Sequence, residues 1–364
     1  MNVAARLALW GRLRAAGVVE RDLPADAAIV VPWYVRAMIG TAAWIAALFV
    51  MGSILALLSG LFRNSAAMVA IGLVLCAIAV VVMRAGAANV FVAQFAFALS
   101  LAGQGLFVGG WFAHADLDSA NAGAVANGLR FLVVFAFEAC LVLLAPAYVH
   151  RVLCTLAAAI AFGGALVVWK AGVLLAPVLA LGYALAALRS TRDGELIALW
   201  QPVVAGLALA LAASVAALVV ATSIAEVDAR LARSALLPWT GQAAMTVAFG
   251  IVIALLLRDA GVRSDSRAGI AVWLAAGAVA AAAWFVSGLL AAGVVLLVAF
   301  AIGHEVLVGL GVITLLATLS RYYYGLEATL LVKSAALCAT GIALLAARYG
   351  MRFVAPAPAE ADHA

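Results

Sequence analysis

Long apolar runs constrain this chain more than any other feature of its sequence. They recur from residue 35 to residue 348, with short polar or basic segments between them. A helix needs about 20 apolar residues to cross a hydrocarbon core of about 30 Å. Charged residues make up only 10% of the chain, too few to cover a water-soluble protein of this length. The sequence therefore predicts a protein whose main solvent is lipid.

Twelve of these runs are candidate membrane-spanning helices. None alternates apolar and polar residues as a barrel strand would, and a helix satisfies its own backbone polar groups in lipid. We therefore expect an all-α, polytopic transmembrane helical bundle. The runs lie near residues 36–61, 66–83, 87–111, 125–148, 151–169, 171–188, 202–224, 239–257, 270–287, 289–303, 306–320 and 328–347.

The number of helices, about 12 or alternatively 11, depends on residues 289–320. This stretch is too long for one ordinary span and short for two, and Gly303, His304 and Glu305 lie near its centre. Twelve helices are preferred, because an unpaired histidine and glutamate at mid-membrane would be costly. The helices together form a predicted transmembrane unit over residues 33–348, followed by a disordered tail over residues 349–364.

The basic residues predict which side of the membrane each loop occupies. With the N-terminus inside, fourteen arginines and lysines fall on the inner side and six on the outer side, so we expect a cytoplasmic N-terminus. Residues 1–32 precede the first span. Within them, Leu7, Trp10 and Leu13 share one helical face, which predicts a short amphipathic helix on the membrane surface or docked against a partner.

Residue types that bind metals, cofactors or nucleic acids are not grouped in this sequence. The four cysteines stand in separate apolar runs without CxxC spacing or a neighbouring histidine, so they are interpreted as packing residues. The basic residues are scattered singly and form no patch that would fit nucleic acid. We therefore expect no metal, no cofactor and no nucleic-acid partner.

Enzyme motifs are also missing. His304 and Glu305 do not begin the zinc motif HExxH, because position 308 is valine. The loops leave no room for a catalytic domain outside the membrane. The sequence therefore predicts no catalytic residues, and any catalysis would have to occur within the bundle.

Arg130 and Glu138 are the first candidates for an intramembrane polar site. Eight residues separate them, which places them on roughly one face of a helix and about 12 Å apart along its axis. Because a carboxylate near mid-membrane is expensive, Glu138 should be protonated or paired inside the bundle. It could serve as a proton or cation site, or as an interhelical hydrogen bond that fixes packing.

The last helices supply the other candidates for this polar site. His304 and Glu305 are either a titratable pair at a helix break or an ordinary helix cap. Glu327 and Lys333 are six residues apart and therefore face different sides of one helix, which predicts partners on other helices.

Amides and glycines occur together in the run 87–111. It contains Asn89, Gln94 and Gln104, and the spacing of Gly105 and Gly109 would let another helix approach closely. Packing accounts for both features without a ligand.

Aromatic residues stand at both ends of the predicted bundle. Trp33 and Tyr34 precede the first span, and Tyr322, Tyr323 and Tyr324 follow Arg321 near the last. The simplest interpretation is an aromatic belt at the membrane interface. A ledge that binds lipid headgroups or sugars is the alternative.

The two ends of the bundle also carry the most specific sequence patterns. Residues 32–52 read PWYVRAMIGTAAWIAALFVMG, and residues 320–348 read SRYYYGLEATLLVKSAALCATGIALLAAR. Together they resemble the bacterial membrane-protein family catalogued as domain of unknown function 4401, which has no established activity. The resemblance implies a multi-pass protein of the bacterial inner (plasma) membrane. It also implies two partners, a companion polytopic membrane protein and a small membrane-anchored protein with a GDYXXLXXP motif.

Three functions remain open at this point. The chain could be a membrane subunit of a multi-protein assembly, a transporter that uses Glu138 and polar residues of the last helices, or an embedded enzyme acting on lipid or lipid-linked glycan. A transporter predicts a water-accessible cavity that reaches Glu138 or Glu305. A structural subunit predicts the same residues sealed by hydrogen bonds, and an enzyme predicts a lipid-sized opening near paired His304 and Glu305.

Overall fold

The computed structural model describes most of the predicted bundle and a short N-terminal segment. The described residues are 3–17, 33–57, 64–85, 89–113, 124–192, 194–227, 238–284, 286, 288–325, 331 and 334. Within these ranges the chain is helical and contains no strand, which confirms the predicted all-α fold.

Eight of the described helices are long and apolar enough to cross a membrane, and three shorter apolar helices accompany them. The α-helices are α1 (Val3–Ala15), α2 (Trp33–Leu57), α3 (Ser65–Ala85), α4 (Val90–Phe112), α5 (Ala124–Leu144), α6 (Tyr148–Val168), α7 (Leu175–Arg192), α8 (Ile197–Val227), α10 (Pro238–Asp259), α11 (Arg267–Ala283), α12 (Leu289–Ala301) and α13 (Glu305–Gly325). Single 3₁₀ turns at Gly172–Leu174 and Gly194–Leu196 lead into α7 and α8.

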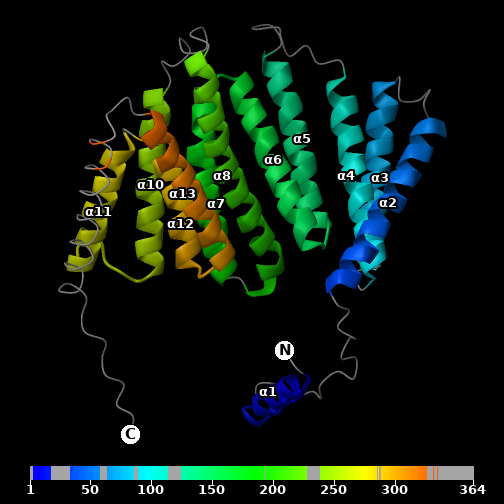
Figure 1. Ribbon diagram of the computed structural model, residues 1–364, viewed down its shortest axis with the longest axis horizontal. Coiled ribbons are helices and arrows are strands. Elements are labelled where there is room, and N and C mark those ends of the chain that lie inside the picture. Colours follow the sequence, from blue (N-terminus) through cyan, green and yellow to red (C-terminus); the bar gives the residue numbers. More distant parts are fainter. Residues whose placement is uncertain are drawn as a thin grey trace.

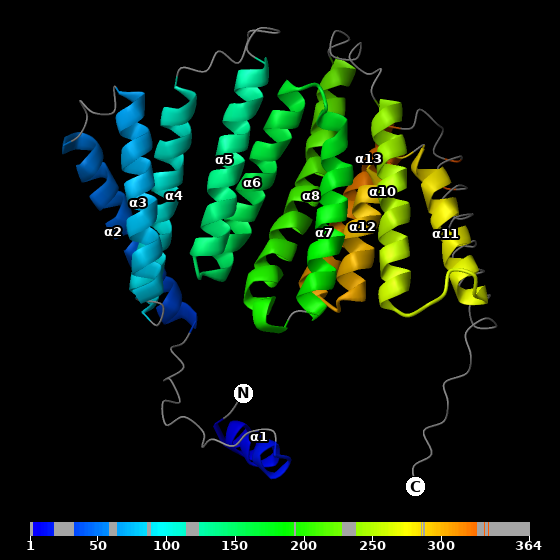
Figure 2. The same ribbon diagram turned by 180° about the vertical axis from the view of Figure 1, so that it is seen from behind.

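The helices from α2 onward stand side by side in one bundle, and α1 lies apart from them (Figures 1 and 2). Helices α2, α3 and α4 form one end of the bundle, α5 and α6 stand in the middle, and α7 to α13 form the other end. The largest core of buried side chains lies in this last group and in α6, where leucine, valine and alanine pack between α7, α8, α10 and α12.

A sharp turn separates α12 from α13, so residues 289–320 form two helices as the preferred count requires. Gly303 has φ of +67°, a left-handed conformation that glycine adopts without steric cost. The backbone N–H groups of Gly303 and His304 donate to the carbonyls of Phe300 and Ala299, which satisfies the end of α12. The run 328–347 lies outside the described residues except for positions 331 and 334.

Helices α3 and α4 pack with their backbones in direct contact. A Cβ atom added to Gly72 would lie 2.6 Å from the carbonyl oxygen of Gly103, and one added to Gly110 would lie 2.7 Å from that of Ser65. Gly105 and Gly109, the glycines predicted to allow a close approach, do not make this backbone contact. Nothing lies within 4 Å of a Cβ atom added to Gly105, and only the methyl group of Met68 lies near a Cβ atom added to Gly109. Gly103 and Gly110 face α3 instead.

The joint between α4 and α5 is different, because bulky side chains hold these helices together. The rings of Phe107 and Phe137 stack with centroids 4.1 Å apart, and those of Phe112 and Phe131 lie 4.8 Å apart. Trp111 Nε1 donates to the carbonyl oxygen of Arg130 at 3.1 Å. The α2 to α4 group therefore meets the remainder of the bundle through side chains.

Candidate functional site

Six polar or thiol side chains gather at this joint, and we call them the α3–α6 cluster. Each is at most 8% exposed, although apolar residues surround them. Four helices contribute, so the cluster forms only when the bundle is assembled. Its members are Cys76 on α3, Ser100 and Gln104 on α4, Glu138 on α5, and His150 and Cys154 on α6. The Cys76 thiol donates to the carbonyl oxygen of Ser100 at 3.5 Å.

His150 lies at the centre of the hydrogen bonds in the cluster. Its Nε2 atom is 2.7 Å from Ser100 Oγ, and its Nδ1 atom is 3.5 Å from Cys154 Sγ. Gln104 Nε2 donates to Ser100 Oγ at 3.3 Å and to Cys154 Sγ at 3.6 Å. Ser100 and Gln104 are four residues apart on α4, as His150 and Cys154 are on α6. Each pair therefore occupies one helix face.

Glu138 completes the cluster from α5. A side-chain hydrogen bond joins it to Cys154, and the residue is 2% exposed. Its Oε2 atom is buried and has no hydrogen-bond partner among the described residues. A buried polar atom without a partner costs about 1–3 kcal/mol, so this carboxyl is an expensive residue to keep in an apolar bundle.

Glu138, His150 and Cys154 lie in the halves of α5 and α6 that meet at the α5–α6 turn. Glu138 is six residues before the end of α5, and Cys154 is six residues after the start of α6, which places both about 9 Å from the turn. Two arginines bind carbonyl oxygens at this turn. Arg84 Nε donates to Leu144 at 3.0 Å, and Arg151 Nε donates to Ala145 at 2.6 Å.

A comparison of the sequence with protein-family models found one family. The model described as Domain of unknown function (DUF4401) matches residues 32–352. The chain belongs to the DUF4401 family. The matched range contains every member of the α3–α6 cluster, and comparisons with curated proteins and solved structures gave no match.

This DUF4401 chain is a membrane protein whose outer surface is suited to lipid. Large apolar side chains are exposed on helices along the whole bundle, as at Phe49, Leu274, Phe300 and Val306, each more than 70% exposed. Such exposure would be unfavourable in water and is expected where acyl chains are the solvent.

The structure does not bring Arg130 together with Glu138. Both lie on α5, but the partner of Glu138 is Cys154, and no ion pair joins it to Arg130 among the described residues. Two helical turns keep the side chains about 12 Å apart along the axis. Arg130 is half-buried, and its backbone carbonyl accepts the hydrogen bond from Trp111.

His304 and Glu305 lie at the start of α13 and away from the α3–α6 cluster. The ring Nδ1 of His304 accepts a hydrogen bond from the backbone N–H of Leu307 at 3.4 Å, and Glu305 is exposed in the first turn. This arrangement is that of a helix cap. His304 also lines an apolar cavity of about 500 Å³ between α6, α8 and α13. Glu327 and Lys333 lie outside the described residues.

The aromatic residues of the DUF4401 chain occupy the ends of their helices. Tyr34 is exposed at the start of α2, and the side chain of Trp33 is outside the described part. Tyr322 and Tyr324 are 40% and 81% exposed at the end of α13, and the Tyr323 ring meets the Tyr324 ring edge to face at 5.5 Å. A membrane belt remains the prediction for these residues.

Asn89, Gln94 and Gln104, the amide side chains predicted to serve packing, each bind different partners. Asn89 caps α4, because its side chain accepts from the N–H groups of Phe91 and Val92. Gln94 accepts a hydrogen bond from Trp44 on α2. Gln104 belongs to the α3–α6 cluster.

Sequence reasoning missed His150, Cys154 and Ser100 as site residues. His150 lies between the predicted runs 125–148 and 151–169, so the sequence predicted a loop there. In the structure the loop is at residues 145–147, and His150 belongs to the first helical turn of α6. The available signal was the four-residue spacing of the polar pairs on α4 and α6. The described residues contain no group of three histidine, cysteine or acidic side chains placed to hold a metal ion.

Proposed function

We propose that this protein is a permease of the bacterial inner membrane in which Glu138 binds and releases a proton during transport. The observation that carries this proposal is the position of Glu138. It is 98% buried, one carboxyl oxygen lacks a partner among the described residues, and a hydrogen bond leads from the residue to Cys154. Ionisable groups inside membranes are rare unless they serve ion or proton pathways.

The cluster offers a route for the proton. Glu138 contacts Cys154, the Cys154 sulfur lies 3.5 Å from His150 Nδ1, and His150 Nε2 lies 2.7 Å from Ser100 Oγ. A neutral imidazole accepts a proton on one ring nitrogen and releases one from the other. Each transfer moves one proton from a donor to an acceptor and breaks no bond between heavier atoms.

The place of the cluster between two groups of helices supports the same proposal. Helices α3 and α4 are in backbone contact at Gly72 and Gly103, so they are expected to move as a unit. The α4–α5 joint is made of rings and the polar cluster, which can rearrange without separating two backbones. Transporters bind their ions at such an interface and open alternately to each side of the membrane. The sealed Glu138 of this structure then corresponds to an occluded state, and a water-accessible cavity at Glu138 is expected when the α4–α5 joint opens.

Proton flux into proteoliposomes tests the proposal. Purified protein is reconstituted with an enclosed pH dye, and a potassium diffusion potential is imposed. Wild-type vesicles are expected to change internal pH faster than vesicles without protein, and Glu138→Gln vesicles should match the latter. Glu305→Gln is the control, because that carboxyl is exposed at the start of α13. Equal flux in wild-type and Glu138→Gln vesicles would contradict the proposal.

A second candidate function is that of a membrane subunit in a multi-protein assembly. It is favoured by the burial of the α3–α6 cluster away from solvent. Glu138 and His150 are 2% and 0% exposed, as expected for groups that fix the packing of helices. The proposed partners are the companion polytopic membrane protein and the small GDYXXLXXP-motif protein. Affinity capture from native membranes tests this function. Under it, Glu138→Gln should lower the melting temperature and retain the captured partners.

A further inference from the structure

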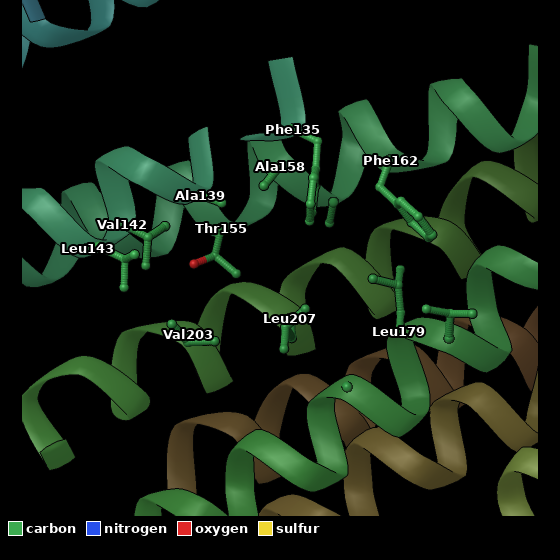
Figure 3. Close-up of a pocket in the computed structure, with 13 residues that line it drawn as sticks. Phe135, Ala139, Val142, Leu143, Thr155, Ala158, Phe162, Leu179, Val203 and Leu207 are labelled. Carbon is green, nitrogen blue, oxygen red and sulfur yellow. The ribbon is translucent and has the colours of Figure 1, made fainter. Parts of the chain in front are cut away.

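A long apolar cavity runs along the surface of the bundle, separate from the α3–α6 cluster. Its volume is about 470 Å³, and it lies between α5 and α6 on one side and α7 and α8 on the other. Figure 3 shows its side chains facing the space between these helices, with Thr155 as the polar side chain among the labelled residues. Its lining includes Phe135, Leu143, Phe162 and Leu207.

The cavity opens toward lipid and extends along α5. Leu143 and Val178 on its rim are 62% and 45% exposed. Its lining on α5 extends from Phe135 to Leu143, a distance of about 12 Å along the helix axis. An apolar slot that is parallel to the helices and open to the membrane fits an extended acyl chain.

Positively charged arginine side chains lie at one end of this cavity. Arg151 is one helical turn from Thr155, whose hydroxyl donates to the Arg151 carbonyl oxygen at 2.8 Å. The Arg151 guanidinium spans the gap between helices, because Nε donates to Ala145 O after α5 and Nη1 donates to Ala198 O at the start of α8. It therefore lies at the end of the cavity where Leu143 is found.

Arg84 adds a second charge at the same end. Its Nε binds the carbonyl oxygen of Leu144, and Arg151 Nε binds that of the next residue, Ala145, so the two guanidinium groups are neighbours at the α5–α6 turn. Neither arginine forms an ion pair among the described residues. Two neighbouring guanidinium groups without a carboxylate attract an anion, and the remaining N–H donors of Arg151 can bind phosphate oxygens.

We propose that this cavity is a binding site for one anionic phospholipid. An acyl chain fills the slot between α5, α6, α7 and α8, and the headgroup phosphate binds at Arg151 with Arg84 nearby. The charge and the apolar slot are adjacent, and a phospholipid is the membrane component that carries both features in one molecule. The site is independent of proton binding at Glu138.

Native mass spectrometry of the purified, delipidated protein tests this site. The protein in detergent is titrated with phosphatidylglycerol and, separately, with phosphatidylcholine of the same acyl chains. Wild-type protein is expected to bind one phosphatidylglycerol about fivefold more tightly than phosphatidylcholine, the difference that one basic residue near an anionic headgroup supplies. Equal affinity for the two lipids would overturn the proposed headgroup contact.

Gly182→Leu tests the slot without changing charge. Gly182 lines the cavity on α7, and a Cβ atom there would meet only Leu207 Cδ1 at 3.9 Å, so a larger side chain can enter the cavity. The variant is expected to bind both lipids at least about fivefold more weakly. Gly277→Leu is the matched control, since nothing lies within 4 Å of a Cβ there on α11. Wild-type binding by Gly182→Leu would overturn the proposal.

Arg151→Gln tests the charged end. It should bind phosphatidylglycerol no more tightly than phosphatidylcholine, whereas Arg258→Gln on α10 should keep the wild-type preference. The lost carbonyl contacts of Arg151 can also destabilise the bundle, so the melting temperature is measured in parallel. If Arg151→Gln does not fold, the Gly182→Leu result and the lipid preference of the wild type decide the proposal alone.

Discussion

Ser100 Oγ lies 2.7 Å from His150 Nε2, although fifty residues separate the two in the chain. This contact links α4 to α6 past the end of α5, so three consecutive helices share one buried set of hydrogen bonds. Lipid offers neither group a replacement partner, and the bond is therefore expected to contribute to the stability of the bundle.

Ser100→Ala should lower the free energy of unfolding by about 1 kcal/mol, because it leaves His150 Nε2 with fewer partners in a buried site. Reversible unfolding in mixed detergent measures the change. Ser53→Ala serves as a control, since that hydroxyl is exposed and bonds within its own helix to Phe49 O. A loss no larger than the control's would mean that the Ser100 bond is energetically unimportant.

Gly72→Ala should destabilise the protein by about 1–3 kcal/mol, because overpacking forces two helices apart. The added Cβ would lie 2.6 Å from both Gly103 O and Phe107 N, which are backbone atoms that cannot rotate away. Unfolding in mixed detergent again gives the measurement.

Gly105→Ala is the matched control for this substitution on α4. Nothing lies within 4 Å of a Cβ at Gly105, and alanine favours a helix by about 1 kcal/mol over glycine. The control should therefore be neutral or stabilising. Equal effects of the two substitutions would argue against the close approach of α3 and α4.

The interaction free energy between Arg192 and Asp259 should be small. Their side chains meet at 2.6 Å between the ends of α7 and α10, but they are 60% and 36% exposed. Water and salt screen such a pair, and about 0.2–1 kcal/mol is expected from a double-mutant cycle with Arg192→Gln and Asp259→Asn. Added salt should shrink the coupling, and a coupling that is insensitive to salt would show that the pair is shielded from water.

Arg263→Gln should raise the pKa of Asp265 toward its ordinary value of 3.8. In the loop between α10 and α11, Arg263 Nε and Nη2 donate to the two Asp265 oxygens at 3.0 and 2.7 Å, which lowers the pKa of this carboxyl. A depressed carboxyl pKa contributes stability above the unfolded-state pKa and loses it as pH falls through the folded-state pKa. Titration of the Asp265 carboxyl by NMR measures the shift, and an unchanged pKa would contradict this assignment.

The sequence predicted the helices well because each apolar run has to satisfy its own backbone in lipid. The break at Gly303 was also predictable, since a histidine and a glutamate follow a glycine in an otherwise apolar stretch. In the structure, His304 caps the new helix. These features are local, so they can be read from neighbouring residues.

The contacts between helices could not be predicted in the same way. Hydropathy does not give the rotation of a helix, so Gly105 and Gly109 were expected at a contact that Gly103 and Gly110 make. The partner of Glu138 was equally hidden, because Cys154 lies on another helix and a cysteine in an apolar run has no distinguishing neighbours. Polar residues at four-residue spacing were the available signal for the α3–α6 cluster.

Helix α12 has thirteen residues and is therefore about 20 Å long, about two thirds of a hydrocarbon core. Most of its side chains are buried among neighbouring helices. A segment this short is a poor substrate for insertion by itself, so during biogenesis we expect it to enter the bilayer as a hairpin with α13. In nascent chains that end soon after Ala301, a cysteine introduced into α12 should then react with a water-soluble thiol reagent, and in longer chains it should be protected.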